Sequence, residues 1–302
     1  MDEQQVDSED AAKADVSFDA RTRSIVEYGK TVLVTLVVAL IIKSFVVEAF
    51  RIPSGSMENT LLVGDFLLVN KLAYGIRMPR HVPMTNLAIP ALIIPVFTGV
   101  ERGDIVVFEF PGERGADGVQ SNYIKRCIGL PGDTAMIRQA RVFINGRELL
   151  FSRTVKFDLR RNAASSRSVT VIPGGRGFTE DDYGPVVIPK RGDVISLDDN
   201  TFEQWRDFIS REGHTTEMNL SGTILIDGRS STTYAVERDY YFMLGDNRNN
   251  SMDSRFWGFV PEENLVGEAL MVYWSWDPDI SLMNFLDKLG SIRWGRFGML
   301  VR

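Results

Sequence analysis

The sequence predicts a mainly β protein that follows one membrane-spanning helix. An apolar stretch from Tyr28 to about Val47 is long enough to cross a bilayer, and from Leu62 onward short apolar runs alternate with turn residues. The composition of the 302 residues, 44% hydrophobic and 25% charged, excludes wholesale disorder and a multi-span membrane protein. The expected division is an acidic tail over 1–27, an anchor over 28–48 and a β-rich domain over 49–302.

The negative charge of the chain is confined to its N-terminal tail. Residues 1–19 hold seven acids and one base, which equals the formal charge of −6 for the whole chain. Residues 20–302 are therefore neutral overall and offer no basic field for nucleic acid. The tail has few apolar residues, so we expect it to be disordered. The single cysteine, Cys127, excludes an intramolecular disulfide framework and a multi-cysteine zinc site.

We interpret the apolar stretch as an uncleaved membrane anchor, because ~20 helical residues cross a ~30 Å hydrocarbon core. Lys43 interrupts the stretch, but its long side chain can snorkel to an interface. A cleaved signal peptide fits poorly because an acidic tail comes first, and a buried core helix is the other alternative. Arg21, Arg23 and Lys30 precede the apolar run Val32–Ile42, which predicts a cytoplasmic N-terminus and places everything after about Ala49 outside the cytoplasm.

Turn signals predict short strands in the remainder of the chain. Gly-Asp pairs precede three apolar runs, Phe66–Val69, Ile105–Phe110 and Val194–Leu197. Asn145-Gly146 lies between apolar residues and is a strong hairpin signal, because both turn residues need positive φ. We expect a short helix over Phe202–Ile209. Residues 150–185 are polar and poorly patterned, so we expect loops there.

Two segments leave alternatives open. Leu87–Phe97 is apolar but too short to span a membrane, and Pro90 and Pro95 would break a helix. It either dips into a membrane face or packs on the protein's own core. The last residues, Lys288–Arg302, hold four bases, no acids and interleaved aromatic residues. They form either an amphipathic piece that touches anionic lipid or the edge of a sheet.

Three clusters of polar and turn residues are candidates for chemistry. They are Ile52-Pro-Ser-Gly-Ser-Met57, Tyr123-Ile-Lys-Arg126 with Gly129-Leu-Pro-Gly-Asp133, and Gly245–Arg255. Each cluster alone has an ordinary structural interpretation as a turn, strand or loop. His81 and His214 lie in settings that favour neither a Ser-His-Asp arrangement nor a metal site. The run DNRNNS at 246–251 lacks an oxygen ligand at its third position and the glycine of a calcium loop.

Taken together, the clusters resemble the type I (leader) signal peptidases. The blocks PSGSM, TLLVGDFLLVNKLAYG, RGDIVVF, YIKR, GLPGD and GDNRNNSMDSRFWGFV follow an N-terminal span in the order of that family. The resemblance covers about 50–75, 102–133 and 241–266, and it leaves a variable β insert of about 134–239 unmatched. It implies a β-rich catalytic domain and a membrane-anchored serine endopeptidase that removes N-terminal signal peptides from exported preproteins, with no cofactor and no metal.

The resemblance assigns Ser56 as the nucleophile and Lys125 as the general base. A serine hydroxyl needs a positioned base, and a lysine can serve only when neutral, which burial promotes by lowering its pKa. The apolar neighbours of Lys125 agree with burial. The resemblance builds an oxyanion hole from the Ser56 N–H and the Ser54 hydroxyl. It also implies supporting residues: Ser251, which would orient the lysine, the pair Asp253 and Arg255, and Gly245.

The resemblance further implies a substrate leader that ends in small residues, often Ala-X-Ala, and binds as an added strand. The residues that match its pocket walls are Phe50, Ile52, Pro53, Met57, Leu61, Tyr123 and Ile124. Two positions depart from the family pattern. Asn59 stands where proline is usual, which puts the backbone stiffness beside the nucleophile in question. Asn122 stands where an acid is common.

The implied partners are signal peptides of secreted preproteins, the phospholipid membrane and the export machinery. The implied location is a bacterial inner (plasma) membrane, crossed once, with the N-terminus cytoplasmic and the catalytic domain on the periplasmic side. An organelle import peptidase would begin with an Arg-rich transit segment, which the acidic tail opposes. Two alternatives remain: a dedicated Ser/Lys maturation protease with a single client, and an inactive membrane-tethered scaffold homologue.

Overall fold

A computed structural model describes residues 27–77, 93–94, 99–112, 121–150, 177–219 and 221–301. The chain divides into two compact units, Met1–Val47 with Arg77–Leu92, and Glu48–Ile76 with Ile93–Arg302. The acidic tail and most of Leu87–Phe97 lie outside the described residues, as does the first part of the loops expected over 150–185. Their predicted states stay predictions.

The first unit contains one apolar helix, Glu27–Val46, which ends in a π-helical turn, η1 (Ile42–Val46). The mean hydropathy of its most apolar window is 2.0, and none of that window is buried inside the protein. A helix that is apolar all round and left uncovered needs an apolar environment. By length and composition it can cross a membrane, and its exposure is not that of a core helix.

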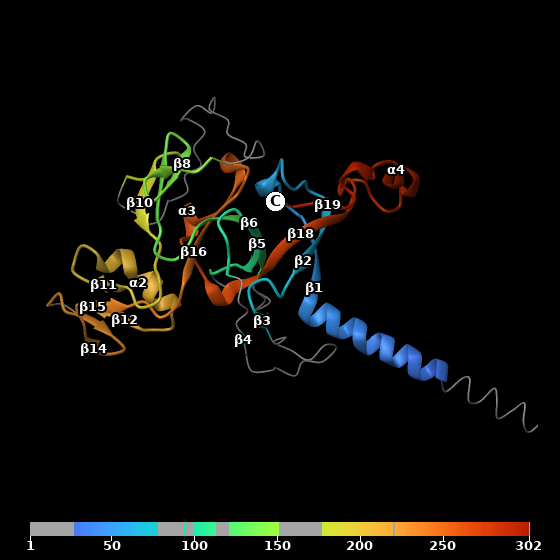
Figure 1. Ribbon diagram of the computed structural model, residues 1–302. Helices are drawn as coiled ribbons and strands as arrows, with labels where there is room; N and C mark the ends of the chain where they lie inside the picture. Colours follow the sequence, from blue (N-terminus) through green and yellow to red (C-terminus); the bar gives the residue numbers. More distant parts are fainter. Residues whose placement is uncertain are drawn as a thin grey trace, which may run out of the picture. The chain divides into compact units, whose positions relative to one another are not determined.

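An eight-stranded sheet forms the centre of the second unit and confirms the mainly β fold class (Figure 1). Its longest strand, β18, pairs antiparallel with β2 on one side and with β5 on the other, and β6 pairs with β5 and β16. The sheet order is β1 (Val47–Arg51), β2 (Asp65–Asn70), β18 (Leu265–Ser275), β5 (Ile105–Glu109), β6 (Asn122–Gly129), β16 (Tyr240–Leu244) and β17 (Val260–Pro261), with β19 (Met299–Leu300) paired to β18.

The described chain between β6 and β16 contains smaller sheets of its own. One has the order β10 (Tyr183–Val187), β7 (Thr134–Arg138), β8 (Arg141–Ile144) and β9 (Arg147–Glu148). The others are β11 (Val194–Ser196) with β15 (Thr233–Ala235), and β12 (Thr216–Met218), β13 (Ile224–Ile226) and β14 (Arg229–Ser230). The remaining short strands are β3 (Ile76–Arg77) and β4 (Ile93–Ile94).

Several local predictions are confirmed. Asn145 and Gly146 have φ of 51° and 77° and join β8 to β9 in a hairpin. Gly64-Asp65 lies at the start of β2, and the other two Gly-Asp pairs precede β5 and β11. The expected short helix is α2 (Phe202–Arg211). The other helical elements are η2 (Gly55–Met57), η4 (Arg248–Asn250), α3 (Ser254–Trp257), η5 (Glu262–Asn264), α4 (Phe285–Gly290) and η6 (Trp294–Arg296).

One prediction was wrong at its end: Tyr183 begins β10, inside the range expected to be loop. The pairing of β10 with β7 shifts register between Tyr183 and Val186. Gly184 and Pro185 fill this irregularity and interrupt the alternation of apolar and polar residues that marks a strand. The strand is therefore hard to recognise from its residues.

Two apolar clusters pack the main sheet. One includes Phe108, Ile128 and Phe242, and the other gathers Ile52, Met57, Leu61, Leu67, Val69, Ile105, Val107, Ala269, Val272 and Val301. The second cluster joins the segment before β2 to β18 and to the end of the chain. It therefore fixes the segment that carries Ser56.

Candidate active site

Ser56 and Lys125 come from distant parts of the sequence and lie side by side. Ser56 lies in the tight turn η2, and Lys125 lies in the middle of β6, opposite Val106 of β5. Lys125 Nζ is 2.8 Å from Ser56 Oγ and 3.0 Å from the Ile124 carbonyl oxygen. Ser56 is 7% exposed and Lys125 is 4% exposed. The hydroxyl group of Ser56 and the amine of Lys125 are thus directly hydrogen-bonded to each other at a buried position.

Burial lowers the pKa of Lys125 to about 8. The main cause is desolvation, because a charged ammonium loses its hydration in the interior. The carboxylates of Asp253 and Asp246 act in the opposite direction and favour the ammonium. A lysine with this pKa is largely neutral at mildly alkaline pH, so it can accept a proton from a hydroxyl at 2.8 Å.

Two hydrogen-bond donors are close to the serine oxygen. The Ser54 hydroxyl is exposed, and its oxygen is 3.5 Å from Ser56 Oγ. The backbone N–H of Ser56 itself belongs to the first turn of η2, where N–H groups have no partner within the turn. Gly55, which lies between the two serines, has no side chain that could cover these donors. Such donors can stabilise negative charge that develops on a carbonyl oxygen bonded at Ser56.

Gly245 and Ser251 lie close against the serine turn. A Cβ at Gly245 would be 2.1 Å from Ser251 Oγ and 2.7 Å from the Ser56 carbonyl oxygen, so only glycine fits. Ser251 Oγ is buried and makes no hydrogen bond with any described residue. The bond from Ser251 to Lys125 that the resemblance implies is therefore not made in this structure. Lys125 Nζ is directed at Ser56 and at the backbone instead.

Asp253 and Arg255 form a buried pair behind this loop. The Asp253 carboxylate accepts hydrogen bonds from Arg255 Nε at 2.8 Å, from Arg255 Nη2 at 2.9 Å and from Gly245 N at 3.1 Å. Arg255 also donates to the Arg248 carbonyl oxygen at 2.7 Å. Burial alone would raise the pKa of Asp253, but Arg255 holds that pKa below its ordinary value. The pair links α3 to Gly245.

Five of the seven predicted substrate residues pack in one apolar cluster: Ile52, Met57 and Leu61, which are buried, and Phe50 and Ile124, which are partly buried. Tyr123 packs in the other cluster, where its ring stacks on Phe110 with centroids 4.8 Å apart. Pro53 is exposed. Six of the seven therefore belong to the two apolar clusters that pack the main sheet.

The sequence did not predict a buried polar cluster that bonds the segment just after the serine turn η2. Asp246 is fully buried and accepts hydrogen bonds from Arg126 Nε at 2.8 Å and Nη2 at 2.7 Å. The Thr60 hydroxyl donates to the same carboxylate at 2.5 Å. Arg126 follows Lys125 directly in β6, and its charge is paired with Asp246 inside the protein. Asp246 lies in the same motif as Gly245, which was the available signal.

Asn247 was also missed, and it bonds the serine turn directly. Its backbone N–H donates to the Ser56 carbonyl oxygen at 3.0 Å. Its side-chain amide donates to the Gly55 carbonyl oxygen at 3.0 Å and to Glu58 Oε2 at 3.1 Å. The loop after β16 therefore holds the turn through residues on both sides of Ser56.

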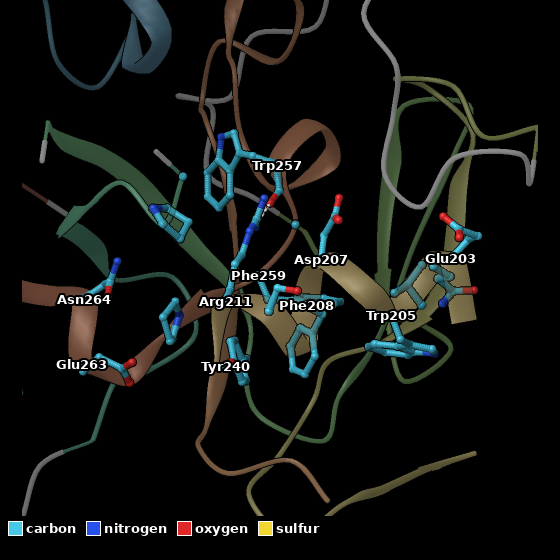
Figure 2. A pocket seen from close by; sticks show the side chains of 17 residues that line it. Glu203, Trp205, Asp207, Phe208, Arg211, Tyr240, Trp257, Phe259, Glu263 and Asn264 are labelled. Atoms are coloured by element: carbon cyan, nitrogen blue, oxygen red, sulfur yellow. Dashed lines mark hydrogen bonds between the residues drawn. The ribbon is translucent and has the colours of Figure 1, made fainter. Parts of the chain in front are cut away.

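A cavity of about 710 Å³ lies elsewhere in the second unit, between α2 and the turn that follows α3 (Figure 2). Its lining includes Trp205, Phe208, Arg211, Tyr240, Trp257 and Phe259. Arg211 Nη1 donates to the Trp257 carbonyl oxygen across it at 2.7 Å. None of the site residues predicted from the sequence lines this cavity.

Comparison with known proteins agrees with this fold. The chain matches the family model "Signal peptidase, peptidase S26" over residues 25–274. The signal peptidase I of Pseudomonas aeruginosa is 34% identical over 280 residues, which are 89% of this chain and 79% of the relative. That of Pseudomonas fluorescens is 33% identical, over 89% of this chain and 80% of the relative. The chain therefore belongs to the S26 signal peptidase family and is a peptidase.

Two further matches have lower coverage than the two Pseudomonas proteins, one of the relative and the other of this chain. The signal peptidase I of Haemophilus influenzae is 30% identical over 82% of this chain and 69% of the relative. A solved signal peptidase I from Enterococcus faecalis V583 is 24% identical over 57% of this chain and 98% of its own, with a TM-score of 0.28.

Proposed function

We propose that the chain is a membrane-anchored serine endopeptidase that removes N-terminal signal peptides from exported preproteins, with Ser56 as nucleophile and Lys125 as general base. The observation that carries the proposal is the 2.8 Å distance between Ser56 Oγ and the amine of a buried lysine whose pKa is about 8. The relatives named signal peptidase I support the class of substrate.

Acylation of the serine is the first proposed step. Neutral Lys125 Nζ takes the hydroxyl proton as Ser56 Oγ attacks the scissile carbonyl carbon. The oxyanion is stabilised by the Ser56 N–H and the Ser54 hydroxyl, and one such donor typically contributes about 2.7–4 kcal/mol. The C–N bond then breaks, and the Lys125 ammonium gives its proton to the leaving amine. The leader remains as an ester of Ser56.

Hydrolysis of this ester completes the cycle. Lys125, neutral again, takes a proton from a water molecule as the water oxygen attacks the ester carbonyl. The ester C–O bond breaks, the proton returns to Ser56 Oγ, and the leader leaves with a free carboxyl group. Gly245, Asp253 and Arg255 do not exchange protons in this scheme. Together with Ser251, they hold the serine turn against β6.

The proposed specificity rests on the apolar walls around the serine. A leader strand that ends in small residues would lie against Phe50, Ile52, Pro53 and the start of β6. The buried side chains of Met57 and Leu61, with Tyr123 and Ile124 on β6, limit the space beside Ser56. Alanine fits such a space, and larger side chains are excluded by overlap.

The proposed location is a bacterial inner membrane with a cytoplasmic N-terminus and a periplasmic catalytic domain. The helix Glu27–Val46 supports an anchor. Exposed apolar side chains near the C-terminus, Phe285 at 60%, Leu286 at 80% and Trp294 at 69%, support contact with phospholipid. In this scheme the export machinery delivers the preprotein to the periplasmic face.

The test compares the purified full chain with Ser56→Ala and Lys125→Met in phospholipid vesicles, using two unrelated preproteins. We expect cleavage by the parent protein and by the control variant Lys190→Met, which changes an exposed lysine. Ser56→Ala and Lys125→Met should leave both preproteins intact. Cleavage by either variant at the parent rate would contradict the mechanism. Cleavage of only one preprotein would favour a protease with a dedicated client.

A further inference from the structure

The segment that carries Ser56 is a loop closed at its base. The Ile52 N–H donates to the Asp65 carbonyl oxygen at 2.8 Å, and the Gly64 N–H donates to the Ile52 carbonyl oxygen at 3.0 Å. These two bonds join the beginning and end of the segment 52–65, with Ser56 between them. Any group that fixes the base of this loop therefore acts on the position of Ser56.

Arg296, from η6 near the end of the chain, binds the base of the loop. Its Nε and Nη2 donate to the Asp65 carboxylate at 2.9 Å and 2.6 Å. Its Nη2 also donates to the Thr60 carbonyl oxygen at 2.9 Å. Asp65 is fully buried and accepts a further bond from the Leu62 N–H at 2.8 Å. One guanidinium thus joins the base of the loop to the residue four positions after Ser56.

Arg293 makes a second connection from the same segment. Its Nη1 donates to the Val63 carbonyl oxygen at 2.9 Å, and its own N–H donates to the Ser275 carbonyl oxygen at 2.9 Å. Val301 then packs in the apolar cluster that contains Met57. The C-terminal segment 293–301 therefore contacts the serine loop through two arginines and shares an apolar cluster with it through Val301.

We propose that Arg293 and Arg296 are positioning residues for the reaction at Ser56, a role that rests on the proposed function. Asn247 holds the turn around Ser56 from the side of β16. The two arginines hold the loop from the opposite end of the sequence. Charge-assisted bonds to carbonyl and carboxylate oxygens are stronger than neutral ones, so they restrict the loop more firmly. A displacement of about 1 Å between reacting groups can cost about 100-fold in rate.

The proposed role requires an arginine at 296, because only a planar guanidinium has several N–H donors that can bond the Asp65 carboxylate and the Thr60 carbonyl oxygen together. The carboxylate of Asp65 takes two bonds, while the Thr60 carbonyl oxygen takes another in a different direction. A lysine ammonium at 296 would keep the charge but not the bidentate geometry. Arg296→Lys should therefore have a kcat between those of the parent and of a variant with no cation.

The test uses two variants of the full chain and a peptide substrate with Ala-X-Ala before the scissile bond. Arg293→Met removes one connection. Asp65→Asn with Arg296→Met removes the other without leaving a buried unpaired charge, and the asparagine oxygen can still accept from Leu62. We expect kcat to fall about 10- to 100-fold while KM stays within about twofold. The pH midpoint should stay near 8, because the surroundings of Lys125 are unchanged.

Arg211→Met is the matched control, because Arg211, like Arg293, donates from its guanidinium to a backbone carbonyl oxygen, that of Trp257, at 2.7 Å. It should keep the parent kcat. Thermal unfolding shows whether each test variant is folded. The inference is overturned if both folded test variants keep the parent kcat, or if the loss of kcat only matches the fraction of protein that is unfolded. Those results leave the proposed function intact. Cleavage by Ser56→Ala would defeat the proposed function itself.

Discussion

Gly245 packs directly on Ser251: a Cβ added to Gly245 would lie 2.1 Å from the Ser251 hydroxyl oxygen and 2.5 Å from its Cβ. The same added atom would lie 2.7 Å from the carbonyl oxygen of Ser56. Real Cβ atoms do not approach other heavy atoms so closely, so the loop after β16 and the serine turn would have to separate. The absence of one methyl group therefore sets how closely the loop approaches the nucleophile.

We predict that Gly245→Ala lowers kcat/KM by about 100-fold or more, because the serine turn moves away from Lys125. The measurement is steady-state cleavage of a peptide substrate, with thermal unfolding to show that the variant folds. Gly99→Ala is the control, since a Cβ there meets nothing within 4 Å. Equal activity of Gly245→Ala and Gly99→Ala would show that the contact has no effect on the reaction.

Activity should rise with pH through a midpoint near 8. The mechanism needs neutral Lys125, and its pKa lies at about 8 because desolvation outweighs the attraction of Asp253 and Asp246. Activity increases with pH because the Lys125 ammonium loses its proton as pH increases. The measurement is kcat as a function of pH with a peptide substrate. An optimum at acidic pH would rule out Lys125 as the base.

Burying Lys125 should also destabilise the folded protein at neutral pH. The pKa of this lysine falls from 10.5 to about 8 on folding, which corresponds to about 3 kcal/mol at about 1.4 kcal/mol per pH unit. The unfolded state binds the proton more tightly, so this cost is complete below pH 8 and disappears as pH rises toward 10.5. Lys125→Met should therefore unfold at a higher urea concentration than the parent at pH 7.

The comparison that tests this idea is the same urea titration near pH 10. The stability difference between Lys125→Met and the parent should shrink there, because the parent lysine is neutral in the folded state and has begun to lose its proton in the unfolded state as well. Lys190→Met, at an exposed position, serves as the control and should change stability little at either pH. A constant advantage of Lys125→Met at both pH values would mean that packing and not charge is responsible.

The sequence predicts those parts of the fold that depend on local chemistry. The Asn145-Gly146 hairpin and the strands after Gly-Asp pairs follow from turn residues that need particular backbone angles. The apolar helix follows from length and hydropathy alone. By contrast, β10 was missed because Gly184 and Pro185 interrupt its alternation. The order of strands in the main sheet depends on pairings distant in sequence, which no local pattern reports.

The same distinction applies to the candidate site. Ser56 and Lys125 were predicted as site residues from short motifs that resemble a family, and each motif spans only a few residues. The buried contacts around them are long-range: Asp246 with Thr60, and Arg296 with Asp65. These pairs join positions far apart in the sequence, and no local pattern gives the partner of a charged residue. The geometry of the loop thus required the structure.

Asn59 offers a test of the departure from the family pattern. Its φ of 87° lies in the left-handed region, and the Thr60 N–H donates to the Met57 carbonyl oxygen at 3.1 Å, as in a type II turn. Proline is fixed near −65° and cannot adopt this angle. We predict that Asn59→Pro loses several kcal/mol of stability or fails to fold, while Asn59→Gly stays within about 1 kcal/mol of the parent.

Urea unfolding of Asn59→Gly, Asn59→Ala and Asn59→Pro measures this effect. Asn59→Ala should lose about 1 kcal/mol, because alanine lacks the local hydrogen bonding that makes asparagine tolerant of positive φ. The order of stability should therefore be glycine, then alanine, then proline. If proline were as stable as glycine, the turn would have a different backbone conformation, and Ser56 would be held as in relatives that carry proline there.

His214 predicts a pH effect on stability that is separate from the catalytic one. Its Nδ1 is 2.7 Å from Asp227 Oδ2, its Nε2 is 3.0 Å from Glu237 Oε1, and the Tyr234 ring packs beside it with centroids 5.6 Å apart. Only an imidazolium donates to both carboxylates. The hydrogen bond to Asp227 is the main cause that raises the pKa of His214, which partial burial opposes.

The sign of the effect follows from that raised pKa. The stabilisation is complete below the ordinary pKa of histidine and is lost as pH rises through the higher folded value. His214→Gln should therefore lower the melting temperature most at about pH 5 and progressively less toward about pH 9. Asp227→Asn should show the same trend, because it removes one of the two acceptors. The pH midpoint of cleavage by His214→Gln should equal that of the parent, since the hydrogen bonds of His214 to Asp227 and Glu237 join parts of the insert and do not involve Lys125. A melting-temperature loss that is equal at every pH would mean that His214 acts through packing alone.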